Sequence, residues 1–225
     1  MAGLPRTGAG TRCAMNEREQ LVQRLLKDAG TTYASEAGIR INDKPMPLFQ
    51  LLVLCMLASK PIDATTAMRA ARELFKTGLR TPKAVLASDR RTMISAFGRA
   101  HYVRYDESSA TRLTDMAEQV RDEYSGDLRE IAGRSQQDIG EAKRMLKKFK
   151  GIGETGADIY LREVQDVWTW VRPYFDDRAT AAAKQLGLPV DASKLASLAP
   201  RANARLAAAL VRVALDDDLR RQVTG

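Results

Sequence analysis

The sequence predicts an all-α protein. Apolar residues recur at spacings of three and four along most of the chain, which is the pattern of helices with one buried face. Glycine or proline stands near most ends of these periodic segments, where helices start or stop. Strand-like alternation is almost absent, and the short segment "AGIRIND", residues 37–43, is the only candidate strand.

Ten segments carry the helical period and are joined by short connections. In chain order they are residues 16–29, 47–59, 63–77, 82–87, 89–97, 108–124, 139–149, 154–166, 177–186 and 203–214. The polar segment "SGDLREIAGRSQQD", residues 125–138, lacks the period, so we expect a linker there.

The linker divides the chain into expected structural units. We expect a first helical lobe over residues 45–125 and a second over 126–187. The helices expected in 16–44 and 188–225 are predicted to pack with the second lobe. The opening residues 1–15 contain no apolar core of a secretory signal, and we expect a disordered tail there.

Composition and charge favour a polyanionic partner. The chain has 225 residues, of which 44% are hydrophobic, so it is long enough for a sizeable core. Its formal charge of +8 and pI near 9.7 favour nucleic acid first and an acidic membrane surface second. No apolar run approaches the roughly 20 residues needed to span a bilayer. We therefore expect a cytoplasmic protein.

The cysteines and the histidine exclude two kinds of metal site. Cys13 and Cys55 are the only cysteines, and we expect one buried thiol and one unpaired thiol in the tail instead of a disulfide. His101 is the sole histidine, so a zinc site built from cysteine and histidine is excluded. An iron–sulfur cluster with four cysteine ligands is excluded by the count.

A glycine-rich turn interrupts two helical runs in "LKKFKGIGETGADIYL", which begins at Leu146. Glycine suits a backbone that turns sharply or approaches another molecule closely, and the start of the following helix offers free amides to a phosphate. One interpretation is a helix cap beside a solvated lysine face. The other, which we favour, is a helix–hairpin–helix that binds DNA phosphates without reading bases. The predicted DNA contacts are Lys147, Lys148, Lys150, Gly151, Ile152, Gly153, Thr155 and Gly156.

Two adjacent acids open the next helix in "VWTWVRPYFDDRATAAAKQLGLP". An aspartate at the head of a helix is commonly a cap, which contributes about 0.5–2 kcal/mol. From the residues alone, Asp176 and Asp177 are therefore open to both a capping and a catalytic interpretation.

From about residue 45 to residue 189 the chain resembles the helix–hairpin–helix DNA glycosylases of the endonuclease III superfamily. "LKKFKGIGETGA" matches the family's hairpin, and "FDDRATAAAKQLGLP" is similar to the element that carries its essential aspartate. Counting back from Leu186 and Gly187 aligns that aspartate with Asp176. Asp177 is the alternative, because some alkyl-base glycosylases carry an Asp-Asp pair and use the second member.

The resemblance also implies residues that enter the DNA and residues that hold the base. "LFQLLVLCMLASKPIDATTAMRAARELF" is similar to the family's opening helix pair, and puts Lys60 where many members carry a glutamine that enters the duplex. Asp63 matches the acid that follows. "ISAFGRAHYVRYDESSATRL" resembles the wedge segment, with Arg99 at or beside the wedge position. The base-pocket candidates are His101, Tyr102, Tyr105 and Tyr174, and a core role is the alternative for the aromatic side chains.

Three departures from the family define what the resemblance implies. Bifunctional members carry a lysine at the position of Thr155, and that lysine forms a Schiff base and cleaves the strand. The four-cysteine cluster is missing, and Arg178 stands where many members have histidine. The resemblance thus implies a monofunctional glycosylase that hydrolyses the N-glycosidic bond of a damaged or mismatched base.

The implied fold has two helical lobes with a DNA-binding cleft between them. The implied partner is double-stranded DNA, which the protein would bind as a monomer. No membrane partner is implied, and the protein would be associated with the nucleoid when it is bound to DNA. No cofactor is expected, apart from the option of a monovalent cation at the hairpin carbonyls. Two alternatives are a non-catalytic protein that binds damaged or bent DNA, and an abasic-site lyase that uses Lys150 or Lys60.

Overall fold

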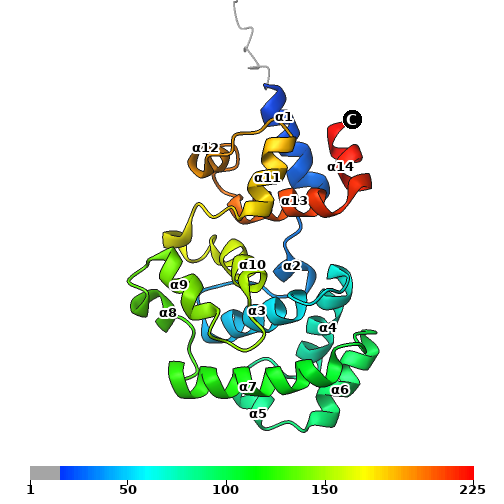
Figure 1. Cartoon of the computed structure of the whole chain (residues 1–225), viewed down its shortest axis with the longest axis vertical. Helices are drawn as coiled ribbons and strands as arrows, with labels where there is room; N and C mark the ends of the chain where they lie inside the picture. The colour runs from blue at the N-terminus through cyan, green and yellow to red at the C-terminus, as the bar shows by residue number, and fades with distance from the viewer. Residues whose placement is uncertain (1–15) are drawn as a thin grey trace, which may run out of the picture.

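The computed structural model describes residues 16–225, and every regular element in that range is a helix (Figure 1). The predicted all-α class is therefore confirmed. Residues 37–43 form no strand. The tail expected at residues 1–15, with Cys13, lies outside the described residues.

The elements follow the predicted periodicity closely. Their bounds are α1 (Glu17–Arg24), the π-helical turn η1 (Leu25–Ala29), α2 (Tyr33–Glu36), α3 (Pro45–Ala58), α4 (Ala64–Lys76), α5 (Pro82–Leu86), α6 (Arg90–Arg99), α7 (Asp106–Tyr124), α8 (Glu130–Arg134), α9 (Ile139–Leu146), α10 (Glu154–Val164), the 3-10 turn η2 (Thr169–Val171), α11 (Asp177–Gln185), α12 (Ala192–Ser197), α13 (Asn203–Leu215) and α14 (Asp217–Thr224). The sequence prediction missed α2, α8, α12 and α14, because one or two turns hold too few apolar residues to show a period.

The described chain has two clusters of buried apolar side chains. The larger cluster takes its side chains from α2 to α10 and from η2. The smaller one joins α1 and η1 to α11, α12, α13 and α14. Figure 1 shows α1 and α11–α14 gathered at one end of the molecule and α3–α10 at the other. The hairpin helices α9 and α10 therefore share a core with α3–α7, and the two ends of the described chain share the other.

Residues 125–138 are not a free linker, so that prediction was wrong. They contain α8, and Leu128 just before this helix and Ile131 within it are completely buried in the larger core. Two buried apolar side chains are enough to anchor the segment, but too few to produce a periodic pattern.

Helix α3 runs through the larger core and supports the hairpin. Its side chains are buried almost all round, as expected for a helix without a polar face. Cys55 is buried there as predicted, and burial raises the pKa of its thiol well above the usual value. A Cβ at Gly156 of α10 would lie 2.5 Å from Ser59 Oγ, so this glycine lets α10 approach the end of α3 closely.

No helix in residues 16–225 combines the length and the apolar character required to cross a membrane.

Candidate functional site

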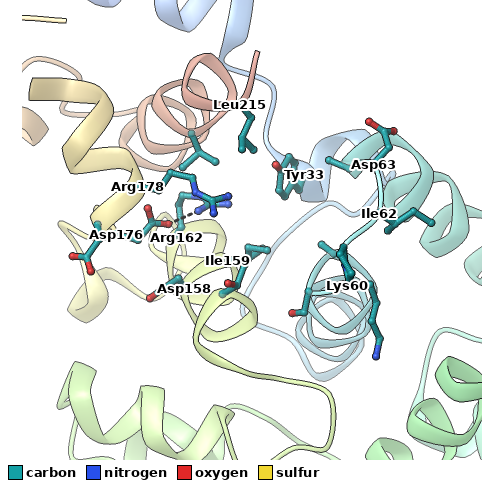
Figure 2. Close-up of a pocket in the computed structure, with 17 residues that line it drawn as sticks. Tyr33, Lys60, Ile62, Asp63, Asp158, Ile159, Arg162, Asp176, Arg178 and Leu215 are labelled. Atoms are coloured by element: carbon teal, nitrogen blue, oxygen red, sulfur yellow. Dashed lines mark hydrogen bonds and ion pairs between the residues drawn. The ribbon is translucent and has the colours of Figure 1, made fainter. Parts of the chain in front are cut away.

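A pocket of about 880 Å³ opens where α2, the end of α3, α10, the start of α11 and the end of α13 meet (Figure 2). Four of the side chains singled out from the sequence line it, although they lie on separate segments. They are Lys60, Asp63, Thr155 and Asp176, and the alternative acid Asp177 lies at the same pocket.

Asp176 is both a helix cap and a buried acid of the pocket. Its Oδ1 accepts a hydrogen bond from the Ala179 amide at 2.8 Å, which caps α11. Its Oδ2 accepts a hydrogen bond from the guanidinium of Arg162. The residue is only 8% exposed, whereas Asp177 is exposed to solvent. The capping role and a place in the pocket are therefore compatible.

The sequence analysis missed Arg162, which is the closest partner of Asp176. Arg162 lies on α10 and is 3% exposed. Burial opposes its charge, but Asp176 and the neighbouring Glu163 outweigh burial and raise the pKa of the guanidinium. The signal in the sequence is an Arg-Glu pair inside the otherwise apolar run "IYLREV", where charged side chains are rarely buried unless they are paired.

Glu163 fixes α2 beside the pocket. Its carboxylate accepts hydrogen bonds from the backbone amides of Tyr33 at 3.1 Å and Ala34 at 2.9 Å, at the start of α2. Burial raises the pKa of Glu163, and the nearby guanidinium of Arg162 opposes that shift. Through this contact the Tyr33 ring, which the sequence analysis did not identify, becomes part of the pocket wall.

The two glycines of the hairpin have different structural roles. Gly151 has a φ of +92°, and a Cβ there would lie 2.9 Å from Arg112 Cδ. It is required by the fold of the turn. Gly153 has a φ of −96°, begins α10 as its N-cap, and has open space where a side chain would be. Ile152 between them is buried and anchors the turn.

The hairpin cations are exposed but partly neutralised. Lys147, Lys148 and Lys150 all lie on the surface. Lys147 Nζ is 2.6 Å from Glu154 Oε2, and Lys150 Nζ is 3.0 Å from Asp115 Oδ2. Exposed pairs of this kind are weak and exchange readily with a phosphate.

Glu154 is an acid at the point where a phosphate would meet the hairpin. It is the first residue of α10 and pairs with Lys143 as well as Lys147. Hydrogen bonds from Lys143 and Lys147 lower the pKa of Glu154 to about 2, so it is ionised at neutral pH. This negative charge was not considered in the sequence analysis.

Tyr174, a base-pocket candidate, does not line the pocket but contacts Asp158, which does. The Tyr174 hydroxyl donates a hydrogen bond to Asp158 Oδ1, and Asp158 lines the pocket beside Thr155. Burial, followed by the hydrogen bond to Asp158, raises the pKa of Tyr174. Lys143 Nζ lies 2.5 Å from Asp158 Oδ1, so this ion pair links α9 to α10.

The two expected wedge residues lie in different places. Lys60 lines the pocket, and its Nζ lies 5.7 Å from the centroid of the partly exposed Tyr105 ring. Arg99 is exposed at the end of α6, where its Nε lies 3.1 Å from Glu73 Oε2, and it does not line the pocket.

The other three base-pocket candidates also lie outside the pocket. Tyr102 is completely buried in the larger core, with its hydroxyl 3.3 Å from the Leu57 carbonyl oxygen, and burial raises its pKa to about 12. His101 is exposed in a left-handed turn with a φ of 59°. Neither of them, nor Tyr105, is among the residues that line the pocket.

No group of three or more histidine, cysteine, aspartate or glutamate residues in the described range is placed to hold a metal ion. No protein-family model, curated protein or solved structure matches the chain at a significant level.

Proposed function

We propose that this protein is a monofunctional DNA glycosylase that removes a damaged or mismatched base from duplex DNA. One observation carries the proposal. Lys60, Thr155 and Asp176, which the sequence singles out on three separate segments, line a single pocket. A chance resemblance gives no reason for these residues to meet.

The proposed reaction assigns one task to each part of the site. The hairpin amides and lysines hold the phosphates, and the target nucleotide leaves the stack and enters the pocket. As the glycosidic bond breaks, the sugar gains positive charge. The carboxylate of Asp176 is buried at this pocket, where a fixed negative charge stabilises the developing cation more strongly than in water. No cofactor takes part in this scheme.

The pocket has the size and lining expected for a nucleoside. Its volume of about 880 Å³ lies in the range usual for ligand pockets, roughly 300–1,000 Å³. Ile62, Ile159 and Leu215 supply apolar surface on which a base would pack, while the acids come from α10, from the start of α11 and, with Asp63, from the start of α4.

Thr155 supports water as the nucleophile. It lines the pocket but has no amine, so it forms no imine with the sugar. Of the two lysines considered as substitutes, Lys60 lines the same pocket, whereas Lys150 pairs with Asp115 and does not. A lyase alternative would therefore depend on Lys60.

A second candidate, a non-catalytic protein that binds damaged or bent DNA, is favoured by the pairing of Asp176. Arg162 and the Ala179 amide each engage one carboxylate oxygen, and the guanidinium offsets the negative charge. A protein that only binds DNA would need the hairpin but no catalytic carboxylate, so the neutralised charge of Asp176 would not impair it.

A panel of duplexes separates the two functions. Each duplex carries one defined lesion, chosen from alkylated purines, deaminated bases, oxidised pyrimidines and mismatched adenine. We expect at least one free base to appear in the supernatant, measured by mass spectrometry. Tight binding to damaged duplexes without release of any base would support the non-catalytic function instead.

A further inference from the structure

The carboxylate of Asp176 is held from two directions. The Ala179 amide donates to Oδ1 at 2.8 Å from the start of α11, and the Arg162 guanidinium donates to Oδ2 from α10. Rotation of the carboxylate would break both hydrogen bonds. Figure 2 shows the Arg162 and Asp176 side chains meeting at the pocket, joined by the dashed line.

Arg162 is itself fixed by its surroundings. Its Cζ lies 5.6 Å from the centroid of the Tyr33 ring, a distance typical of a cation–π contact. Glu163 holds the same ring in place by accepting from the Tyr33 amide. The guanidinium therefore has little freedom to leave Asp176.

Stability alone does not explain why an arginine occupies this position. A buried ion pair is often no more stabilising than apolar side chains of similar volume. In addition, Arg162 Nε is buried and has no hydrogen-bond partner among the described residues, which is unfavourable. An arrangement that is costly for folding and lies at the pocket acid is better explained by a role in the site.

We propose that Arg162 is a positioning residue, which holds Asp176 in the orientation that stabilises a cationic sugar. The inference rests on the proposed glycosylase function. Because Arg162 and the Ala179 amide fix both oxygens of Asp176, the carboxylate is oriented to stabilise the cationic sugar through its fixed charge. Arg162 touches neither the sugar nor the base in this scheme.

Two abasic-site analogues test this role without any turnover. One duplex carries a neutral tetrahydrofuran and the other a cationic pyrrolidine, which imitates the charge of the sugar at the transition state. The ratio of the two Kd values measures how well the site recognises positive charge. Wild type is expected to prefer the cationic analogue, and Asp176→Asn is expected to lose that preference.

The variants of Arg162 separate positioning from simple charge balance. If Arg162 only offsets the charge of Asp176, Arg162→Met leaves the pocket more negative and raises the preference for the cation. If Arg162 positions the carboxylate, Arg162→Met lowers the preference for the cationic analogue about tenfold. Arg162→Lys, which keeps the charge, then retains about a third of the wild-type preference. Arg172→Met is the matched control, because it breaks the Arg172–Asp166 ion pair outside the pocket, and should leave the ratio unchanged.

Each outcome decides the inference. Thermal unfolding checks that the variants are folded. If Arg162→Met does not fold, Arg162→Lys decides instead, and a ratio of the two Kd values equal to that of wild type overturns the positioning role. A raised or unchanged ratio in folded Arg162→Met also overturns it, while wild type keeps its preference and the glycosylase proposal stands. A wild type that binds neither analogue more tightly than undamaged duplex contradicts the proposed function itself, and the inference with it.

Discussion

Glu154 Oε2 lies 2.6 Å from Lys147 Nζ across the hairpin turn. The residue that begins the DNA-binding helix of our proposal is thus an acid, and it pairs with a lysine that we expect to hold phosphate. A phosphate that binds here must displace Glu154 or accept its repulsion. We therefore expect Glu154 to limit the DNA affinity of the proposed hairpin.

Replacing Glu154 tests this limit. Glu154→Gln is expected to lower the Kd for undamaged duplex about three- to tenfold at low salt, and to steepen the log–log dependence of affinity on salt, because Lys147 loses its acidic partner and becomes free for phosphate. Fluorescence anisotropy over a salt series measures both. Glu141→Gln is the control, since Glu141 pairs with Arg144 on the preceding helix. Weaker binding by Glu154→Gln would argue against phosphate at this turn.

The two hairpin glycines are expected to separate folding from binding. Gly151→Ala should lower the free energy of unfolding by about 1–2 kcal/mol. The φ of +92° disfavours a residue with a Cβ, and the added Cβ would lie only 2.9 Å from Arg112 Cδ. Gly153→Val should lower stability by no more than about 1 kcal/mol, because valine is a poorer N-cap than glycine, but it should weaken duplex binding, since its side chain would extend into open space at the turn. Thermal unfolding and anisotropy distinguish them. Equal DNA affinity for Gly153→Val and wild type would place the phosphate elsewhere.

The helices were predictable from the sequence, and parts of the site were not. Apolar residues at spacings of three and four located α3, α4, α7 and α13, because each buries apolar side chains over at least three turns. The same logic missed α8, whose one buried residue is Ile131. A short element of this kind depends on its packing partners, and a local pattern does not reveal them.

The candidate site was predictable where a local motif carried it. The hairpin glycines and Asp176 stand in recognisable segments, so the sequence identified them. Arg162 and Tyr33 were missed because their roles depend on contacts between distant segments. Tyr33 reaches the pocket through a hydrogen bond from its amide to Glu163, a contact that leaves no periodic trace.

The two aspartates are expected to respond differently to substitution. Asp176→Asn should abolish base release and also lower stability by up to about 3–5 kcal/mol, because the amide leaves the buried Arg162 without its charge partner. Asparagine still caps a helix, so α11 is retained. Asp177→Asn should keep both activity and stability, because Asp177 is exposed. Single-turnover assays and thermal unfolding measure the two effects, and loss of activity only in Asp177→Asn would shift the catalytic role to that residue.

Thr155→Lys tests the alignment of the hairpin helix. Thr155 and Asp176 line the same pocket, so a lysine at 155 would bring its amine near the sugar. We expect weak strand nicking and a covalent adduct after borohydride reduction, and we expect neither of them from wild type. Glu154→Lys, one position earlier and outside the pocket lining, is the control and should form no adduct. An inactive Thr155→Lys that still binds the lesion duplex would mean that the amine is misplaced by several ångströms.

The most direct test of the central claim is a comparison of strand cleavage with and without hot alkali, on a duplex whose lesion the protein binds. Wild type is expected to leave the strand intact in buffer and to yield a cleaved strand only after alkali, because hydrolysis leaves an abasic site. Asp176→Asn should give no cleavage in either case. Nicking by wild type before alkali, together with a borohydride-trapped adduct, would contradict the monofunctional assignment and direct attention to Lys60. An intact strand after alkali for every lesion that the protein binds would contradict the glycosylase assignment altogether.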